Sequence, residues 1–109
     1  MEGSCHCGAV RIRVAAPPEW VGQCNCSVCR KLAGLFAYYP QADVSVEGET
    51  VGYVWGDRCI SIRHCPVCGC TTHWESLMPD YDRVGVNARM LDGFDPGQVE
   101  VRPIDGASF

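Results

Sequence analysis

The sequence predicts a single all-β domain, residues 1–109, that carries one short helix and binds metal. Apolar and polar residues alternate in short runs, which is the pattern of strands with one buried face. Glycine, proline and aspartate separate these runs, as turns require. Seven of the nine cysteines fall in three tight groups, which favours metal as a stabiliser of so small a domain.

The strands are predicted from β-branched and aromatic residues, and we expect about eight or nine of them. The clearest candidates lie at residues 10–14, 35–39, 44–47, 51–55, 60–63, 84–86 and 99–102. Gly56-Asp57 is expected to form a tight hairpin turn. The one helix is predicted over residues 27–33, with Ser27 as its N-cap and Gly34 at its end.

Charge and hydropathy disfavour several classes of function. The formal net charge is −4 and the longest basic run is the pair Arg30-Lys31, so no nucleic-acid-binding surface is expected. The apolar runs are too short to span a membrane. The first residues show neither the basic nor the apolar region of a signal peptide, and we expect a cytoplasmic protein.

The cysteines suit either disulfides or metal. Nine cysteines in 109 residues are dense enough for a disulfide-bonded secreted domain. The odd number, the missing export signal and gaps too short for neighbours to pair oppose that interpretation. Thiolates this close together suit convergence on one ion, with zinc as the first candidate and iron as the alternative.

The three groups are Cys5 with Cys7, Cys24 with Cys26 and Cys29, and Cys65 with Cys68. The first group requires a bend in the chain, which the flanking Gly3 and Gly8 permit. The second lies at the start of the predicted helix, whose positive end favours thiolates. The third, Cys-Pro-Val-Cys-Gly, is a zinc-knuckle sequence in which Pro66 sets the turn.

Counting suggests how the groups combine. Four thiolates from the first and third groups complete a closed structural site. The second group supplies three, which leaves a fourth coordination position for water or substrate, as in catalytic zinc sites. A fourth protein ligand would instead make a second structural site, and the candidates for that ligand are Cys59, Cys70, His6, His64 and His73.

Three motifs in this order resemble the glutathione-dependent formaldehyde-activating family, which includes the centromere protein V-like proteins. They are Gly-Ser-Cys-His-Cys-Gly from residue 3, Cys-Asn-Cys-Ser-Val-Cys-Arg-Lys-Leu-Ala-Gly from residue 24, and Arg-His-Cys-Pro-Val-Cys-Gly from residue 63. The stretch Val-Asn-Ala-Arg-Met-Leu-Asp from residue 86 is similar to the family's late Leu-Asp motif.

The resemblance implies a β-tent fold, in which small antiparallel sheets share zinc sites. It implies a catalytic-type zinc on Cys24, Cys26 and Cys29, and a structural zinc on Cys5, Cys7, Cys65 and Cys68. The implied activity joins glutathione to formaldehyde, giving S-(hydroxymethyl)glutathione, and is classed with the carbon–sulfur lyases. The implied partners are therefore a small thiol and a small aldehyde. Two positions depart from the family pattern, namely His64 in place of an aromatic residue and the extra Cys70.

The expected chemistry follows from the charge of the second site. A zinc held by three thiolates keeps one net negative charge, so it activates water poorly and suits a thiolate as its fourth ligand. We therefore expect capture of a small thiol beside an aldehyde carbon. Arg30 and Lys31 either offset this charge or form a solvated helix face.

The remaining candidates have ordinary structural interpretations. We expect the histidines at surface or hydrogen-bonded positions and Cys59 as a buried free thiol. The large aromatic residues are expected in the core or in strand pairs, and they are Trp20, Trp55, Trp74, Tyr38 and Tyr39. The alternative to an enzyme is a non-catalytic two-zinc module that binds a protein partner.

Overall fold

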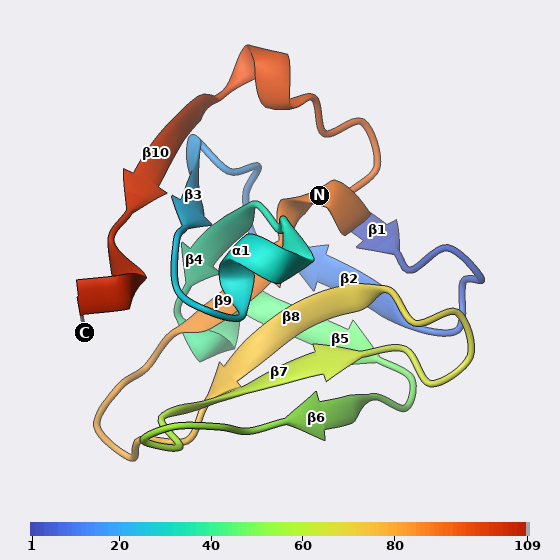
Figure 1. Ribbon diagram of the computed structural model, residues 1–109. Helices are drawn as coiled ribbons and strands as arrows, with labels where there is room; N and C mark the ends of the chain where they lie inside the picture. The colour runs from blue at the N-terminus through green and yellow to red at the C-terminus, as the bar shows by residue number, and fades with distance from the viewer. Residues whose placement is uncertain (109) are drawn as a thin grey trace.

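The computed structural model describes residues 1–108 and arranges ten strands in two sheets (Figure 1). The smaller sheet has the order β1 (Glu2–Ser4), β2 (Arg11–Val14) and β5 (Val44–Glu47). The larger sheet has the order β10 (Glu100–Ile104), β3 (Trp20–Cys24), β4 (Phe36–Tyr39), β9 (Val84–Asn87), β8 (Thr71–Ser76), β7 (Ile60–His64) and β6 (Val51–Tyr53). Neighbouring strands are antiparallel except for β10 and β3. The predicted all-β fold with one short helix is confirmed.

The main hydrophobic core lies between the two sheets. Ile12 and Val14 of β2 pack with Val21, Ala37 and Val86 of the larger sheet. Every residue of β9 is buried, because this strand lies in the middle of its sheet and both of its faces are covered. The strand predicted at residues 84–86 is present, but it has no solvent-exposed face, contrary to the expectation of one buried and one exposed face.

The other face of the larger sheet carries a row of aromatic side chains. Tyr38 lies opposite Gly85, and Gly85 lies opposite Trp74, so the three residues share one face. A Cβ atom at Gly85 would overlap the indole of Trp74, and one at Gly22 would overlap the Tyr38 hydroxyl. The two glycines therefore leave room for both rings to lie against the sheet.

Helix α1 spans Cys29–Leu32 and is shorter than the predicted 27–33. The prediction that Ser27 caps it was wrong, because Val28 holds the N-cap position without a side-chain hydrogen bond. The Cys26 sulfur instead accepts the Cys29 N–H at 3.4 Å and so satisfies an amide of the first turn. The helix ends at Ala33, whose φ is 55°, one residue before the expected Gly34.

Some strand boundaries also differ from the expectation. Strands β1, β3 and β8 lie outside the predicted stretches, because their mixed composition hides the alternation. Gly56-Asp57 does form a turn, in which the Arg58 N–H donates to the Trp55 carbonyl at 3.0 Å. The turn belongs to a longer connection and not to a two-residue hairpin, because β6 ends at Tyr53 and β7 begins at Ile60.

Short 3₁₀ turns complete the connections, and they are η1 (Gln41–Asp43), η2 (Ala88–Met90), η3 (Pro96–Gln98) and η4 (Gly106–Ser108). Within residues 1–108, no helix combines the length and the apolar character needed to cross a membrane.

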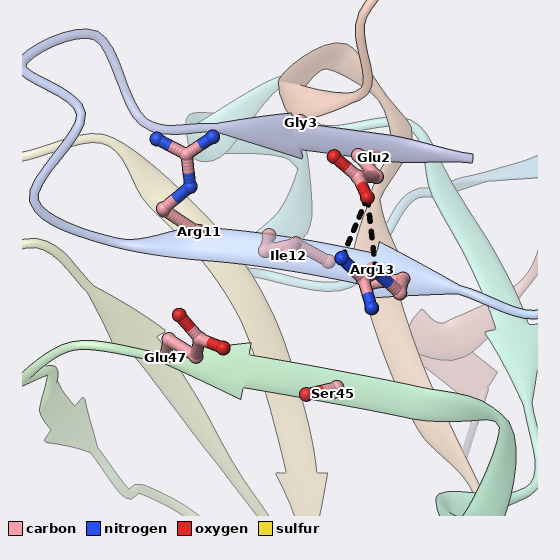
Figure 2. Close-up of a pocket in the computed structure, with 7 residues that line it drawn as sticks. All are labelled: Glu2, Gly3, Arg11, Ile12, Arg13, Ser45 and Glu47. Carbon is pink, nitrogen blue, oxygen red and sulfur yellow. Dashed lines mark hydrogen bonds and ion pairs between the residues drawn. The ribbon is translucent and has the colours of Figure 1, made fainter.

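The outer face of the smaller sheet is polar. Figure 2 shows Arg13 beside Glu2, and a guanidinium nitrogen lies 2.7 Å from the carboxylate. Arg11 lies opposite Glu47, while Ile12 between the two arginines packs into the core. The depression on this face has a volume of about 50 Å³, whereas ligand pockets usually hold roughly 300–1,000 Å³. This face is therefore an ordinary solvated sheet surface.

Candidate metal centre

The first and third cysteine groups meet at one place, here named the four-cysteine cluster (Cys5, Cys7, Cys65 and Cys68). Two of its members lie in the β1–β2 loop and two in the β7–β8 loop, so the cluster joins the smaller sheet to the larger one. The Val10 N–H donates to the Cys5 sulfur at 3.3 Å, and the Val67 N–H donates to the Cys65 sulfur at 3.4 Å. Gly8 and Gly69 have φ values of 84° and 81°, which glycine adopts without strain.

The geometry of the four-cysteine cluster fits a tetrahedral ion. Its four sulfurs lie within 4.8 Å of one another, and the Cys7 sulfur is 3.7 Å from those of both Cys5 and Cys65. Sulfurs placed about 2.3 Å from a tetrahedral zinc are about 3.8 Å apart. Backbone N–H groups of Cys7 and Cys70 lower the pKa of Cys68 to about 5, which favours a thiolate ligand. The cluster can therefore hold a metal ion.

The second group forms a separate cysteine trio (Cys24, Cys26 and Cys29), whose sulfurs also lie within 4.8 Å of one another. Cys24 ends β3 and Cys29 begins α1, so a single short turn presents all three thiols. Within residues 1–108, no other Cys, His, Asp or Glu side chain completes this group. The trio can therefore supply three ligands to an ion, and these residues offer no fourth.

Hydrogen bonds within the trio prepare thiolate ligands. The Cys26 N–H donates to the Cys24 sulfur at 3.4 Å, and the Cys29 N–H donates to the Cys26 sulfur at the same distance. Burial opposes ionisation of Cys26, but these backbone and thiol donors prevail and lower its pKa. Burial raises the pKa of Cys29, and the neighbouring sulfurs add to the rise. The surroundings thus favour the thiolate form at Cys26 and disfavour it at Cys29.

The C-terminal end of the sheet lies against the trio. A Cβ atom at Gly106 would overlap the Cys24 sulfur, so the backbone approaches this thiol closely. Asn25, between two of the cysteines, holds the segment in place. Its side chain donates to Asp105 Oδ1 at 3.0 Å and accepts the Ala107 N–H at 3.0 Å. Its own N–H donates to the Ile104 carbonyl at 3.0 Å.

The trio lines a pocket with a volume of about 390 Å³. The pocket lies on the aromatic face of the larger sheet, and residues of the β6–β7 and β8–β9 connections and of the end of β10 complete its lining. Trp74 and Tyr81 stack within it, with ring centroids 6.4 Å apart. The lining residues outside the trio are Phe36, Tyr38, Trp55, Asp57, Cys59, Ile60, Trp74, Tyr81, Ile104 and Gly106.

Two side chains in the pocket keep their protons at neutral pH. Burial raises the pKa of Tyr38 to about 12, and the Cys24 and Cys29 thiols add to the rise. A hydrogen bond with Asp57 raises the pKa of Cys59, with a further contribution from burial. Tyr38 therefore presents a neutral hydroxyl to the pocket. Cys59 presents a neutral thiol, and it is not a member of the trio.

The other sequence candidates lie away from this pocket. His73 is buried, with its Nδ1 2.9 Å from the Thr72 hydroxyl and its Nε2 3.1 Å from Glu75. Burial lowers the pKa of His73, although Glu75 opposes the shift. The five remaining candidates are not pocket-lining residues, and they are His6, His64, Cys70, Arg30 and Lys31. Both cations of α1 are exposed, as a solvated helix face predicts.

The sequence interpretation missed the aromatic walls of the pocket. Tyr38, Trp55 and Trp74 were expected in the core or in strand pairs, and they do pack in a second core cluster, but all three also line the pocket. Tyr39 does pack in the main core. Cys59 was expected to be buried but is half-exposed beside β7. The available signal was the alternation of Phe36 and Tyr38 with Ala37 and Tyr39, because a strand apolar on both faces has a covered second face.

Known proteins are similar to this chain in sequence and in fold. A curated protein of Halomonas elongata, named "Putative glutathione-dependent formaldehyde-activating enzyme", is 42% identical over 76 residues. The match covers 69% of this chain and 46% of that protein, so the chain corresponds to about half the length of this relative. The crystal structure of a Rhodobacter sphaeroides protein superimposes with a TM-score of 0.78 at 32% identity, covering 94% of this chain and 98% of the other.

The family assignment rests on most of the chain. The sequence profile of the glutathione-dependent formaldehyde-activating enzymes matches residues 1–104. That span includes both groups of cysteines and all but the last of the residues that line the pocket beside the trio. The motif resemblance in the sequence is thereby confirmed, and the chain belongs to the glutathione-dependent formaldehyde-activating enzyme family.

Proposed function

We propose that the protein catalyses the joining of a small thiol to a small aldehyde, and the reverse cleavage, at a zinc ion held by the cysteine trio. In this proposal residues 1–109 act as one domain, in which a second zinc in the four-cysteine cluster has a structural role. The observation that carries the proposal is the position of the trio, whose three thiols line a pocket of about 390 Å³ without a fourth side-chain ligand from residues 1–108.

When bound, zinc held by three thiolates offers a soft fourth position that favours a thiolate over water. The three thiols of the trio line the pocket, and its aromatic walls would limit the access of bulk water to an ion held by them. A substrate thiolate placed there lies beside an aldehyde held in the same pocket, so proximity replaces a collision of two solutes.

The reaction is a simple addition. The thiolate sulfur forms a bond to the aldehyde carbon, the carbonyl electron pair moves to oxygen, and that oxygen takes up one proton, which balances the proton that the thiol lost on ionising. For formaldehyde the product is a hydroxymethyl thioether, and the reverse reaction breaks the same carbon–sulfur bond, as in a carbon–sulfur lyase. Tyr38, which stays protonated, offers the aldehyde oxygen a hydrogen-bond donor within the pocket.

The family description names glutathione and formaldehyde, which are therefore the first substrates to test. Cysteines grouped to bind metal suit a reducing compartment, which supports our placing of the protein in the cytoplasm.

The test is exchange between free formaldehyde and its thiol adduct, measured by magnetisation-transfer NMR with ¹³C-formaldehyde. The zinc-loaded protein is expected to accelerate exchange above the spontaneous rate. Cys26→Ser is expected to stay folded and to lose this acceleration, because one ligand of the trio is gone. The matched control is Cys70→Ser, a thiol outside the trio and the pocket, which is expected to keep it.

Loss of acceleration in both variants, or in neither, would contradict the assignment of the reaction to the trio. A zinc-loaded protein with no acceleration for any thiol or aldehyde would favour the non-catalytic two-zinc module instead.

A further inference from the structure

The pocket beside the cysteine trio has aromatic walls and very little charge. Tyr38, Trp55, Trp74 and Tyr81 supply most of its large surfaces. Thiols apart, Asp57 is the one charged side chain among the residues 1–108 that line it. Asp57 is exposed at the rim, where a carboxylate oxygen accepts the Cys59 N–H at 3.2 Å.

The basic residues that are closest in sequence to the pocket-lining residues do not line the pocket themselves. Arg30 and Lys31 directly follow Cys29, but both are exposed on α1 and neither lines the pocket. Arg58 lies between two lining residues, yet it is exposed and is itself outside the lining. A ligand carboxylate in this pocket therefore finds no arginine or lysine of residues 1–108 among the lining side chains.

The negative charge of a metal-loaded trio further disfavours a carboxylate on the ligand. Three thiolates around a divalent ion leave one net negative charge, and a bound substrate thiolate adds another. A carboxylate on the same ligand would be desolvated next to these charges without a cationic partner, which is unfavourable. Glutathione carries two carboxylates and one ammonium group, so its charge is poorly matched to this pocket.

We propose that the site selects a thiol without carboxylates, neutral or cationic, whose apolar body lies against the aromatic walls. This inference rests on the function proposed above and narrows its substrate class. An ammonium group on the thiol is accommodated beside Asp57, where the two opposite charges attract. Stacking against Trp74 or Trp55 favours an aromatic body over an aliphatic one.

The first experiment compares small thiols of similar size and different charge. Protein loaded with Co²⁺ is titrated with cysteamine, 2-mercaptoethanol and mercaptoacetate, and then with benzyl mercaptan and glutathione. Binding is measured from the sulfur-to-cobalt charge-transfer absorption and from quenching of tryptophan fluorescence. Affinities are expressed per thiolate, because the five thiols differ in pKa, and desalting checks that cobalt stays bound.

The cationic and neutral thiols are expected to bind roughly tenfold or more tightly than mercaptoacetate at low salt. Benzyl mercaptan is expected to exceed 2-mercaptoethanol by about tenfold, because its ring is buried against the walls. Glutathione is expected to bind more weakly than benzyl mercaptan. Tighter binding of glutathione or mercaptoacetate would overturn the inference and leave the proposed function standing.

Two variants at neighbouring positions test the role of charge. Asp57→Asn is expected to reduce the preference for cysteamine over 2-mercaptoethanol by several-fold and to leave the affinity for 2-mercaptoethanol unchanged. Arg58→Gln, the matched control of opposite charge, is expected to leave both affinities unchanged. Weaker glutathione binding in Arg58→Gln would overturn the inference, because it would reveal a cation that receives the carboxylates.

A different result would refute the proposed function itself. If none of the five thiols changes the cobalt absorption, the trio does not accept a thiol, and both proposals fail together.

Discussion

Gly85 is the residue on which the shape of the pocket depends most directly. It lies opposite both Tyr38 and Trp74, and a Cβ atom at this position would overlap the indole of Trp74. Trp74 in turn stacks with Tyr81, which also lines the pocket. A methyl group at position 85 would therefore displace the Trp74 indole and disturb the Tyr81 ring that stacks with it. Gly85 does not line the pocket itself.

Gly85→Ala is expected to lower the free energy of unfolding by about 1–3 kcal/mol, because the indole is forced out of its packed position. The affinity for small thiols is expected to fall while the metal content stays unchanged, since the trio lies on a different segment. Denaturant unfolding, tryptophan fluorescence and the cobalt titration measure the three quantities. Gly97→Ala in an exposed turn is the control, and a Gly85→Ala protein that behaves like this control would contradict the prediction.

At the level of elements, β10 has an unusual role. Its pairing with β3, which ends at Cys24, is the one parallel strand pair within residues 1–108. The segment after it passes close to the trio and is held by Asn25. An edge strand normally leaves one side open to pairing with other chains. Here the last residue of β10, Ile104, and the following Gly106 also form part of the pocket lining.

Asn25→Ala removes two side-chain hydrogen bonds to this segment, each of which contributes about 0.5–1.5 kcal/mol. We expect the amide of Ala107 to exchange with solvent roughly tenfold faster, while the amides of β4 and β9 are unaffected. Hydrogen exchange followed by NMR measures both. Gln23→Ala, an exposed neighbour on β3, is the control. Equal exchange rates in the Asn25→Ala and Gln23→Ala proteins would show that the side chain of Asn25 does not hold the segment.

The strands also differ in how well they could be predicted from the sequence. Strands β2 and β5 have one face in the core and one in solvent, so the alternation of Ile12 with its arginine neighbours predicts them. Strand β8 has buried Thr72, His73 and Trp74 in succession, because both of its faces are covered, and no alternation marks it. An alternation of polar and apolar residues identifies a strand only where one of its faces is exposed to solvent.

For the whole molecule, the four-cysteine cluster joins the two sheets. Its ligands come from two loops 58 positions apart in the sequence. Spacing and counting predict this cluster, because thiols separated by only one or two residues suit convergence on one ion. The aromatic pocket could not be predicted in this way, since it depends on the strand order that places Tyr38, Gly85 and Trp74 side by side.

Cys65→Ser is expected to unfold the protein. A structural zinc contributes folding free energy on the order of 10 kcal/mol, which is comparable to the whole stability of a small domain. Circular dichroism and metal content are the measurements, with Cys26→Ser as the matched substitution that keeps the sheets. If the two variants lose structure to the same extent, the division into one structural and one functional ion is wrong.

The two groups of thiols also differ in how early they can assemble. The trio closes a loop of a few residues, so an unfolded chain can gather it around an ion at small entropic cost. The four-cysteine cluster needs distant segments to meet, which happens only as the sheets form. If both groups bind metal as proposed, an ion supplied during synthesis would meet a complete trio first, and the four-cysteine cluster could take its ion only once the two sheets have formed.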